Sequence, residues 1–405
     1  MENNAWKIVY LATIFSLIVL GLAYYLMVPR DAELYSQEKT DKLAEFYDTR
    51  VTGRKEGRKL WEFTAEKGWT LKNQDASQLI NVKNGRIFNK KGALVVASLV
   101  APRAIVNPRT EIIEAFGQPE GVNKPSKLKA VVDLGKFSSK NKQDWTTIIA
   151  DYIIYRAQQS NSEMTGRAFL IKKNSRLLAD AIGIDHEKKI ARISGHLRLQ
   201  RQDGLLKAFF ADYYGESEKL DVYGSVTFEV KDKGSKATTI RCGRAILFND
   251  PNQDVELYGG VEAVQGKKVS LAGNGIYSRK GKKLFLFGET KTIIEKAQAL
   301  VRQETARKIH DVEFLRARTY ITSDSIEFST RSGNARAAGN VVVTQKGKEA
   351  KAESAYYDDK REILTMKGSV QMKKGTDWLS CKKITVYISR EVFEAEGMVE
   401  AKFEL

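Results

Sequence analysis

The amino-acid sequence predicts an all-β protein. An N-terminal transmembrane helix precedes an elongated open β-jellyroll, a folded-over sheet of 29-residue two-strand repeats with one short helical insertion. Three observations predict this fold: an uncharged run near the N-terminus, glycines that recur at intervals of 29 residues, and apolar and polar residues that alternate with period two around these glycines. Such alternation is typical of a strand with one buried face, and a fixed repeat indicates stacked units that share one core.

The uncharged run extends over 21 residues from Ile8 to Val28. As an α-helix it would reach about 31 Å, which matches the hydrocarbon core of a bilayer. The alternative is a cleaved signal peptide, but the run is longer than the usual signal-peptide core and no small-residue cleavage site follows before Pro29. We therefore predict a single-pass anchor over residues 1–29, a polar linker over residues 30–45, and export of the remaining chain.

Eight glycines define the repeat. They are Gly166, Gly195, Gly224, Gly259, Gly288, Gly339, Gly368 and Gly397. Five of the seven intervals between them are 29 residues; the residue eleven positions before each glycine is large and apolar, and the residue sixteen positions before is small. Each unit is predicted to hold two strands, one ending at the large residue and one passing through the glycine. The glycine either permits close approach of a facing strand or ring, which we favour, or marks a bend.

The residues two positions before each glycine are all apolar, and those two positions after it are apolar except for Thr290. These even offsets predict the inner face of the sheet and an apolar groove. The residues predicted to line the groove are Ile193, Leu197, Leu220, Val222, Val226, Val255, Leu257, Val261, Leu284, Leu286, Val341, Leu364, Met366 and Val370. Arg192, Asp221 and Glu256 should face outward, and Phe285 is the one apolar residue at their position in the repeat.

One longer interval, of 51 residues, separates Gly288 from Gly339. Apolar residues within it follow helical spacing, and this predicts a short helix from about Ile293 to Lys308 in an insertion over residues 293–318. The insertion either lies on the sheet or joins two β bodies.

The composition excludes several functions. Sixty-seven lysines and arginines against fifty aspartates and glutamates give a formal net charge of +17, which favours nucleic acid, anionic lipid or phosphorylated glycolipid as a partner. The anchor weakens the nucleic-acid interpretation, and we predict no nucleic-acid partner. The cysteines and histidines stand in no metal-binding spacing, and no nucleotide-binding or hydrolase motif occurs in its structural context. We predict no catalytic residue, metal site or cofactor, and therefore no enzyme.

Two repeat units resemble a known family. One unit reads AFFADY at residues 208–213 and LDVYGSV at 220–226, and the other reads AESAYY at 352–357 and LTMKGSV at 364–370. Both resemble the OstA-type repeat of lipopolysaccharide-export proteins. The segment over residues 51–65, which ends in LWEFTA, resembles the start of the LptC family domain.

The resemblance implies an LptC-like β domain over residues 46–145 and LptA-like, OstA-like repeats over residues 146–292 and 319–405. Such a protein is expected in the inner membrane, with most of the chain in the periplasm. There it would receive lipopolysaccharide or a related glycolipid from an inner-membrane ABC transporter complex and pass it toward the outer membrane. The alternative is an anchored β-solenoid that acts as a scaffold or glycan-binding protein, with a core filled by side chains.

The last repeat runs in register through Cys381, Val386, Gly397 and Val399, and no capping element follows before Leu405. An uncovered edge strand offers unpaired N–H and C=O groups to another sheet. We expect this edge to pair with an OstA-like bridge or an outer-membrane partner, and the N-terminal edge near residues 46–64 to pair with β domains of the transporter.

Overall fold

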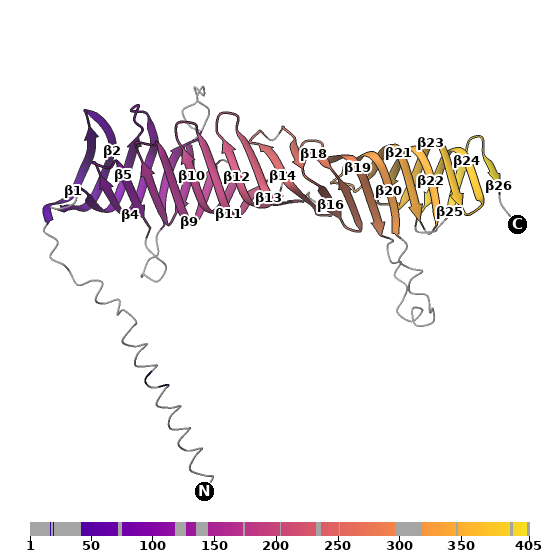
Figure 1. Cartoon of the computed structure of the whole chain (residues 1–405), viewed down its shortest axis with the longest axis horizontal. Coiled ribbons are helices and arrows are strands. Elements are labelled where there is room, and N and C mark those ends of the chain that lie inside the picture. The colour runs from indigo at the N-terminus through magenta and orange to yellow at the C-terminus, as the bar shows by residue number, and fades with distance from the viewer. Residues whose placement is uncertain are drawn as a thin grey trace, which may run out of the picture.

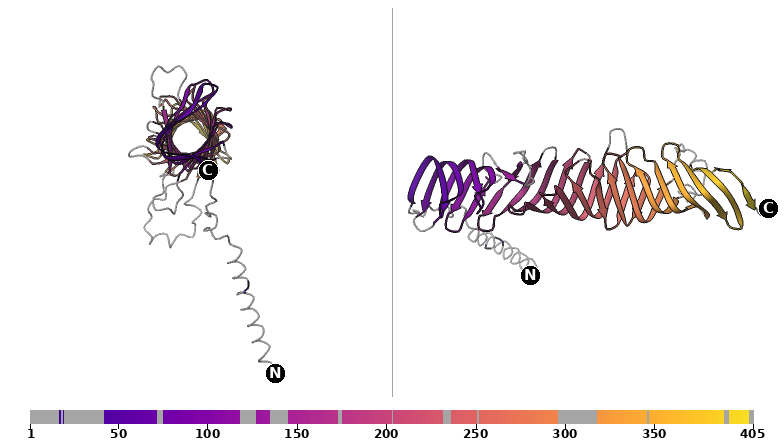
Figure 2. Two further views of the ribbon diagram at one scale, coloured as in Figure 1. Left: turned by 90° about the vertical axis from the view of Figure 1, so that its left-hand side faces the viewer. Right: turned by 90° about the horizontal axis from the view of Figure 1, so that it is seen from above.

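The computed structural model describes residues 17, 19, 42–71, 75–117, 127–134, 145–172, 175–202, 204–231, 236–250, 252–295, 318–345, 347–388 and 392–402. Apart from residues 17 and 19, which are helical, the regular structure among them is 26 strands of one sheet that runs the length of an elongated molecule (Figure 1). Seen end-on, the strands surround a central axis (Figure 2). Strand neighbours pair antiparallel throughout, which confirms the all-β prediction for the described residues.

Nine strands form the N-terminal part of the sheet. They are β1 (Lys42–Lys55), β2 (Arg58–Leu71), β3 (Ser77–Phe88), β4 (Leu94–Asn107), β5 (Ile112–Phe116), β6 (Leu128–Asp133), β7 (Trp145–Ala150), β8 (Tyr152–Arg156) and β9 (Asn161–Lys172). β4 pairs with both β5 and β6, and β9 pairs with both β7 and β8, so each of these short pairs is one interrupted long strand. The last four residues of the predicted linker belong to β1. β7 begins at Trp145, the last residue of the predicted LptC-like domain, so the predicted boundary after residue 145 falls inside this strand and stays a prediction.

Ten strands form the central part. They are β10 (Ser175–Asp185), β11 (Ile190–Arg201), β12 (Gly204–Tyr214), β13 (Lys219–Val230), β14 (Thr238–Phe248), β15 (Val255–Tyr258), β16 (Val261–Gln265), β17 (Lys268–Ala272), β18 (Asn274–Ser278) and β19 (Lys283–Glu295). β15 and β16 both pair with β14, and β17 and β18 both pair with β19. The repeat units of Gly195 and Gly224 each hold the two strands that the sequence predicts: β10 and β11 in the first, β12 and β13 in the second.

Seven strands form the C-terminal part. They are β20 (Arg318–Ser329), β21 (Ala335–Gln345), β22 (Lys348–Asp358), β23 (Ile363–Lys374), β24 (Asp377–Tyr387), β25 (Val392–Glu396) and β26 (Glu400–Lys402). β24 pairs with both β25 and β26, which flank Gly397. The sheet therefore ends, among the described residues, on the strand that the repeat register predicts.

Strand β19 corrects the predicted helix. Ile293 and Ile294 lie in this strand and pair with Tyr320 and Thr319 of β20, while Arg318 begins β20. The side chain of Ile294 is buried and that of Glu295 is exposed, as alternation in a strand requires. Since β19 and β20 pair along their length, the sheet is continuous at this point and does not end in a joint between two bodies. Residues 296–317, with the rest of the predicted helix, lie outside the described residues.

The repeat glycines lie at bends of the strands. Gly195 has a φ of 75° and His196, which follows it, a φ of 40°. The β11–β12 register shifts between Ser194 and Leu197, so these two residues form a β-bulge. A Cβ at Gly195 would collide with the Asp180 carboxylate on the outer side, and the glycine is half-exposed. The bend interpretation is therefore correct here, and the predicted place of the glycine among buried apolar side chains is wrong.

No helix within the described residues is long and apolar enough to cross a membrane. Leu17 and Val19 are helical, and the rest of the predicted anchor over residues 1–29 lies outside the described residues. The anchor and the inner-membrane location therefore stay predictions.

Candidate functional site

The inward side chains form one apolar cluster that extends from Leu60 to Ile388. All fourteen predicted groove residues belong to it, each at most 9% exposed. They lie on β11 (Ile193, Leu197), β13 (Leu220, Val222, Val226), β15 (Val255, Leu257), β16 (Val261), β19 (Leu284, Leu286), β21 (Val341) and β23 (Leu364, Met366, Val370). The structure thus places these residues on the inner face, and their contact with a lipid stays a prediction.

The three residues predicted to face outward differ in exposure. Arg192 is exposed and Glu256 half-buried, whereas Asp221 is only 6% exposed. Arg244 on β14 covers Asp221, with Nε 2.7 Å from Oδ1 and Nη2 2.5 Å from Oδ2. Asp221 therefore lies on the outer face but beneath an arginine, because a bidentate guanidinium covers the carboxylate that it binds.

The sheet is folded over along its length, so that the turns at one end of its strands approach the turns at the other end. We call these two rows of turns the margins of the sheet. Lys268 pairs with Ile294 at one end of β19, whereas Thr330 bonds to Lys282 beside the other end of the same strand. Lys268 nevertheless donates a hydrogen bond to the carbonyl of Gly333, which lies in the same turn as Thr330. Both ends of β19 are thus brought together across the interior. We call the line along which the two margins meet the seam.

Contacts cross the seam at several points along the molecule. They are the Lys55–Glu111 ion pair, the hydrogen bond from Tyr155 Oη to Phe88 O (3.3 Å), the Lys189–Asp133 ion pair (3.1 Å) and the hydrogen bond from Arg201 Nη1 to Phe248 O (3.3 Å). The partners are 47 to 67 residues apart in the chain. The interior is therefore covered by polar contacts between distant turns.

The most buried of these contacts is a cluster around Lys268, which we call the latch. Lys268 Nζ lies 2.8 Å from Asp359 Oδ1 and donates to Gly333 O, and the lysine is 3% exposed. Beside it, Gln265 Nε2 donates to Thr330 O at 2.9 Å. Burial lowers the pKa of Lys268 and outweighs the opposite effect of Asp359.

The aromatic rings of Phe328 and Tyr357 lie beneath the latch, 5.0 Å and 5.3 Å from Lys268 Nζ. A cation over a ring face is attracted to the ring quadrupole, so these rings add to the pairing with Asp359. Asp359 also accepts a hydrogen bond from Lys236 Nζ at 3.3 Å. The latch thus joins two margins of the sheet through one carboxylate and two lysines.

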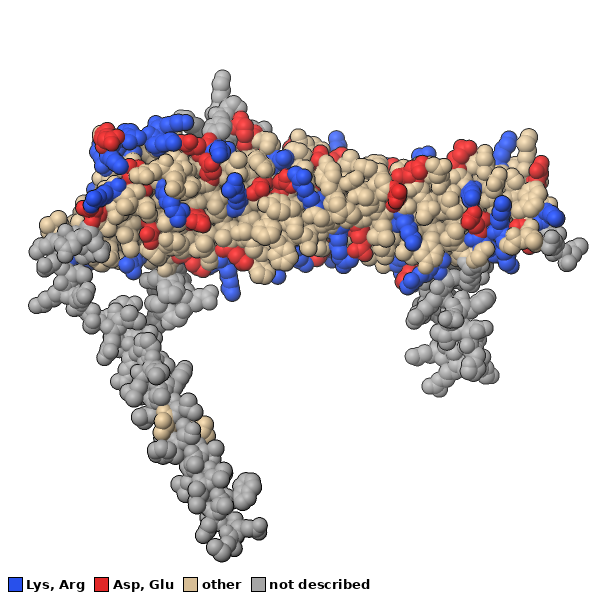
Figure 3. Space-filling view, in the orientation of Figure 1, with Lys and Arg blue, Asp and Glu red and all other residues tan. Residues whose placement is uncertain are grey.

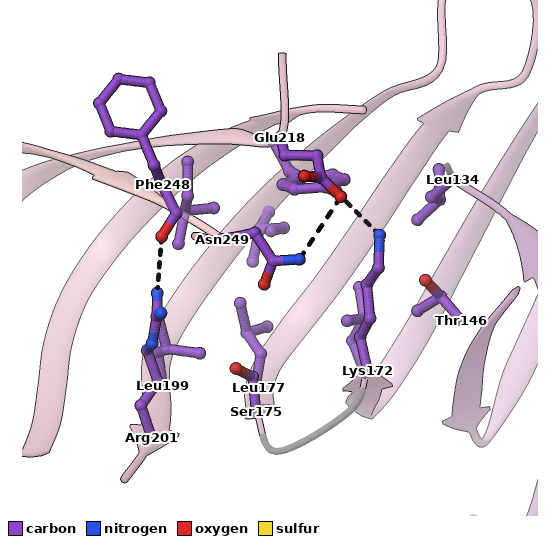
Figure 4. Close-up of a pocket in the computed structure, with 14 residues that line it drawn as sticks. Leu134, Thr146, Lys172, Ser175, Leu177, Leu199, Arg201, Glu218, Phe248 and Asn249 are labelled. Atoms are coloured by element: carbon purple, nitrogen blue, oxygen red, sulfur yellow. Dashed lines mark hydrogen bonds between the residues drawn. The ribbon is translucent and has the colours of Figure 1, made fainter. Parts of the chain in front are cut away.

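An apolar pocket with a polar mouth lies on the seam in the N-terminal half, and we call it the N-terminal pocket (Figure 4). It holds about 560 Å³, including space open to solvent. Its lining consists of Leu134, Thr146, Leu170, Lys172, Ser175, Leu177, Ile193, Leu199, Arg201, Tyr213, Glu218, Leu220, Phe248 and Asn249. At the mouth, Lys172 Nζ donates to Tyr213 Oη at 3.1 Å and Asn249 Nδ2 to Glu218 Oε1 at 3.5 Å. The predicted residues Ile193 and Leu220 thus line a real pocket.

A second pocket, which we call the C-terminal pocket, lies near the end of the described sheet and holds about 680 Å³, including space open to solvent. Its lining consists of Thr319, Val343, Gln345, Lys348, Glu349, Ala350, Leu364, Met366, Met372, Val386, Ile388, Val392 and Phe393. The predicted residues Leu364 and Met366 belong to it. Val392 is 52% exposed, so apolar surface of this region faces solvent.

A third cavity lies beneath the latch. It is lined by Lys268, Thr292, Ile294, Ile321, Ile326, Phe328, Ala335, Ala337, Ala355, Tyr357 and Leu364. Leu364 also lines the C-terminal pocket, so the two spaces are neighbours. The apolar interior therefore continues under the latch.

The seam residues were not predicted from the sequence. Lys172, Arg201 and Gln265 each stand six residues after a repeat glycine, and this shared offset is a signal that could have identified them. Two of their partners, Tyr213 and Phe248, stand at the large-residue position eleven residues before a glycine, but which residues of the two margins meet depends on how far the sheet folds over. The described residues contain no group of three or more histidine, cysteine, aspartate or glutamate side chains that could hold a metal ion.

His186 lies in a turn along the seam, and its titration tests whether this turn is buried. It is 4% exposed, its Nε2 lies 2.8 Å from Ser162 Oγ, and burial lowers its pKa from 6.5 to about 4. Below pH 6.5 the unfolded chain binds a proton here that the folded chain does not. Stability should therefore fall by about 3 kcal/mol between pH 6.5 and pH 4 from this residue alone.

Urea unfolding of the purified chain at pH 7 and pH 5 measures this effect. In His186→Phe the loss of stability on acidification should be smaller than in the parent, since the variant has no proton to gain at this position. An equal loss in both chains would show that His186 is not buried in the folded state.

Comparison with known proteins gives one family match. The model of the family described as LptA/(LptD N-terminal domain) LPS transport protein matches residues 333–392 and 349–405. Among solved structures, the chain is similar to LptH of Pseudomonas aeruginosa, described as the LptA homologous periplasmic component of the lipopolysaccharide transport device. The identity is 13%, the match covers 42% of this chain and 95% of that chain, and the TM-score is 0.26. No curated protein matches. The C-terminal part of the chain is thus similar to the LptA and LptD N-terminal group of lipopolysaccharide transport proteins, with no specific link to LptC.

Proposed function

We propose that this protein is a membrane-anchored periplasmic bridge for lipopolysaccharide or a related glycolipid. It receives the lipid from an inner-membrane ABC transporter complex and carries it toward the outer membrane, with the acyl chains in the apolar interior. The observation that carries the proposal is the continuous apolar cluster beneath a seam with pockets on it. The family match over the C-terminal part supports the same class of cargo.

The physical reason lies in the cost of exposing acyl chains. Each CH2 group in water costs about 0.8 kcal/mol, so a carrier of a multi-chain lipid needs an apolar interior over its whole length. The headgroup is charged and has to stay at a polar mouth. In the N-terminal pocket, Lys172 and Arg201 lie at such a mouth, and their cationic groups could form charge-assisted hydrogen bonds with a phosphate that takes the place of their present partners, Tyr213 and Phe248 O.

The surface charge agrees with an anionic cargo. Lysine and arginine side chains lie among aspartate and glutamate over the face shown in Figure 3, and the net charge of the chain is +17. An excess of positive charge attracts anionic ligands over long range.

The edges of the described sheet support docking to other β proteins. Within the described ranges, β1 pairs with β2 alone, and β25 and β26 pair with β24 alone. Val392 and Val399 near the C-terminal edge are 52% and 50% exposed. We propose that an OstA-like bridge or outer-membrane partner pairs with this edge, and that the transporter's periplasmic β domains pair with β1.

A second candidate function is an anchored scaffold or glycan-binding protein with a solid interior. The observation that favours it is the complete burial of large side chains such as Tyr155 and Tyr277 in the same interior. Tight packing of such rings would leave no room for acyl chains. The two candidates differ in whether lipid occupies the interior.

Native mass spectrometry of the detergent-extracted chain separates them. The bridge is expected to carry copurified glycolipid, with a mass increment that disappears when Leu199 and Leu220, in the lining of the N-terminal pocket, are replaced by tryptophan. Tryptophan there fills the apolar space without adding charge. A chain that folds, judged by its circular dichroism, and carries no lipid when expressed in cells that make lipopolysaccharide would support the scaffold instead.

A further inference from the structure

The latch lies between the two pockets in the order of the chain. The N-terminal pocket is lined by residues up to Asn249, the latch is centred on Lys268, and the C-terminal pocket is lined by residues from Thr319 on. The third cavity continues the apolar space beneath Lys268. On the proposed function, acyl chains would pass under the latch within this apolar cluster, whereas anything held outside the seam meets the latch itself.

A glycolipid headgroup cannot follow the acyl chains under the latch. The third cavity is lined mainly by apolar side chains such as Ile326, and moving a charged, hydrated group into such surroundings costs far more than the lipid gains there. The headgroup has to pass along the seam. It can do so only if the margins at Lys268 and Asp359 separate.

Separation of the margins has a cost that depends on the headgroup. Separation takes Lys268 away from Asp359 and from the rings of Phe328 and Tyr357, which lie on the margin of Asp359, so the ion pair and both cation–π contacts are lost. A phosphate can replace Asp359 as the partner of Lys268, since it accepts charge-assisted hydrogen bonds from an ammonium group. A headgroup without an anion cannot make this exchange.

We propose that Lys268 is a specificity-determining gate residue, which exchanges Asp359 for a phosphate of the passing headgroup and thereby opens the seam. This inference rests on the proposed function, because it requires a glycolipid in the interior. Lys236 lies on the same margin as Lys268, because the neighbouring Thr238 pairs with Gln265, so opening also separates its Nζ from Asp359 Oδ2, 3.3 Å away in the closed state, and exposes this carboxylate to water. The latch then closes behind the headgroup when Lys268 returns to Asp359.

Distance measurement across the seam tests the gate. Lys267 and Arg331 are exposed, flank the latch on opposite margins and are not members of it, so both are replaced by spin-labelled cysteine. The natural Cys242 and Cys381 are buried and should not take up the label. Double electron–electron resonance measures the distance between the two labels on the full chain in detergent. Three samples are compared: the chain alone, the chain with purified lipopolysaccharide, and the chain with the same lipopolysaccharide after enzymatic removal of its phosphates.

Phosphorylated lipopolysaccharide is expected to add a population of distances longer by at least about 5 Å, one inter-strand spacing, and the dephosphorylated lipid is not. A photo-crosslinker at Leu199 monitors binding of both lipids to the N-terminal pocket in parallel. Capture at Leu199 with unchanged distances, or equal widening by both lipids, would overturn the gate while leaving the proposed function intact. Failure of capture at Leu199 and at every other interior position would instead overturn the proposed function, and the gate with it.

Discussion

Replacing Leu257 by aspartate is expected to unfold the central part of the sheet. Leu257 lies in β15, paired with Ala245 on one side and Gly275 on the other, and its side chain is fully buried. The described cluster around it consists of apolar side chains, so the carboxylate would be buried among them at a cost of more than about 4 kcal/mol. Chemical denaturation of the purified chain measures the change.

The neighbouring Glu256 provides the matched control. Its side chain is half-buried on the outer face and accepts a hydrogen bond from Tyr258 Oη at 2.8 Å. Glu256→Gln keeps an acceptor at this position and is expected to change the free energy of unfolding by less than about 1 kcal/mol. Comparable destabilisation by Leu257→Asp and Glu256→Gln would contradict the assignment of the two faces.

Replacing Lys268 by alanine is expected to have the next largest effect. The change removes the cation from a buried pair and leaves the carbonyl of Gly333 without its donor, a loss of about 3 to 5 kcal/mol. The double variant Lys268→Met/Asp359→Leu removes both charges and keeps the volume. It should regain most of the lost stability, because apolar residues of similar size often replace buried ion pairs without cost.

Thermal unfolding of the three chains at one lipid-free condition measures these differences. The parent and the double variant should unfold at similar temperatures, and Lys268→Ala should unfold at a lower temperature than either. If Lys268→Ala unfolds at the same temperature as the parent, the margins are not held together at the latch. A double variant less stable than Lys268→Ala would show that Asp359 is stabilised by Lys236 rather than by Lys268.

The repeat was predictable because it is a local pattern. A strand buries alternate residues whatever its partners are, so the period-two register around each glycine identified the inner face, including Val222 and Leu286. The two-strand unit followed from the fixed spacing of the small residue, the large residue and the glycine. These features need no knowledge of distant contacts.

The predictions were wrong in two situations: where one local pattern fits both a helix and a strand, and where contacts between distant residues determine whether a side chain is buried. The pair Ile293 and Ile294 fits a helix as well as a strand, because the preceding inward residues of β19, Thr290 and Thr292, are polar and hide the alternation. Burial of Asp221 depends on Arg244, 23 residues away. The glycine bend depends on a register shift between strands, which the sequence of one strand does not show.

The seam could not be predicted for the same physical reason. Lys268 and Asp359 are 91 positions apart in the sequence, and they meet because successive bends fold the sheet onto itself. A lysine at the start of a strand is most often a solvated edge residue. Only the folded structure distinguishes it from a buried cation held over two aromatic rings.

Photo-crosslinking at two adjacent positions tests the central claim most directly. A photo-reactive residue at Leu257 points into the apolar interior, and one at Glu256 points away from it. In cells that make lipopolysaccharide, the account predicts that the chain with the reactive group at Leu257 forms a covalent adduct with the lipid and that the chain with the group at Glu256 does not. Equal capture at both positions, or no capture at Leu257 in a folded chain, would contradict the account.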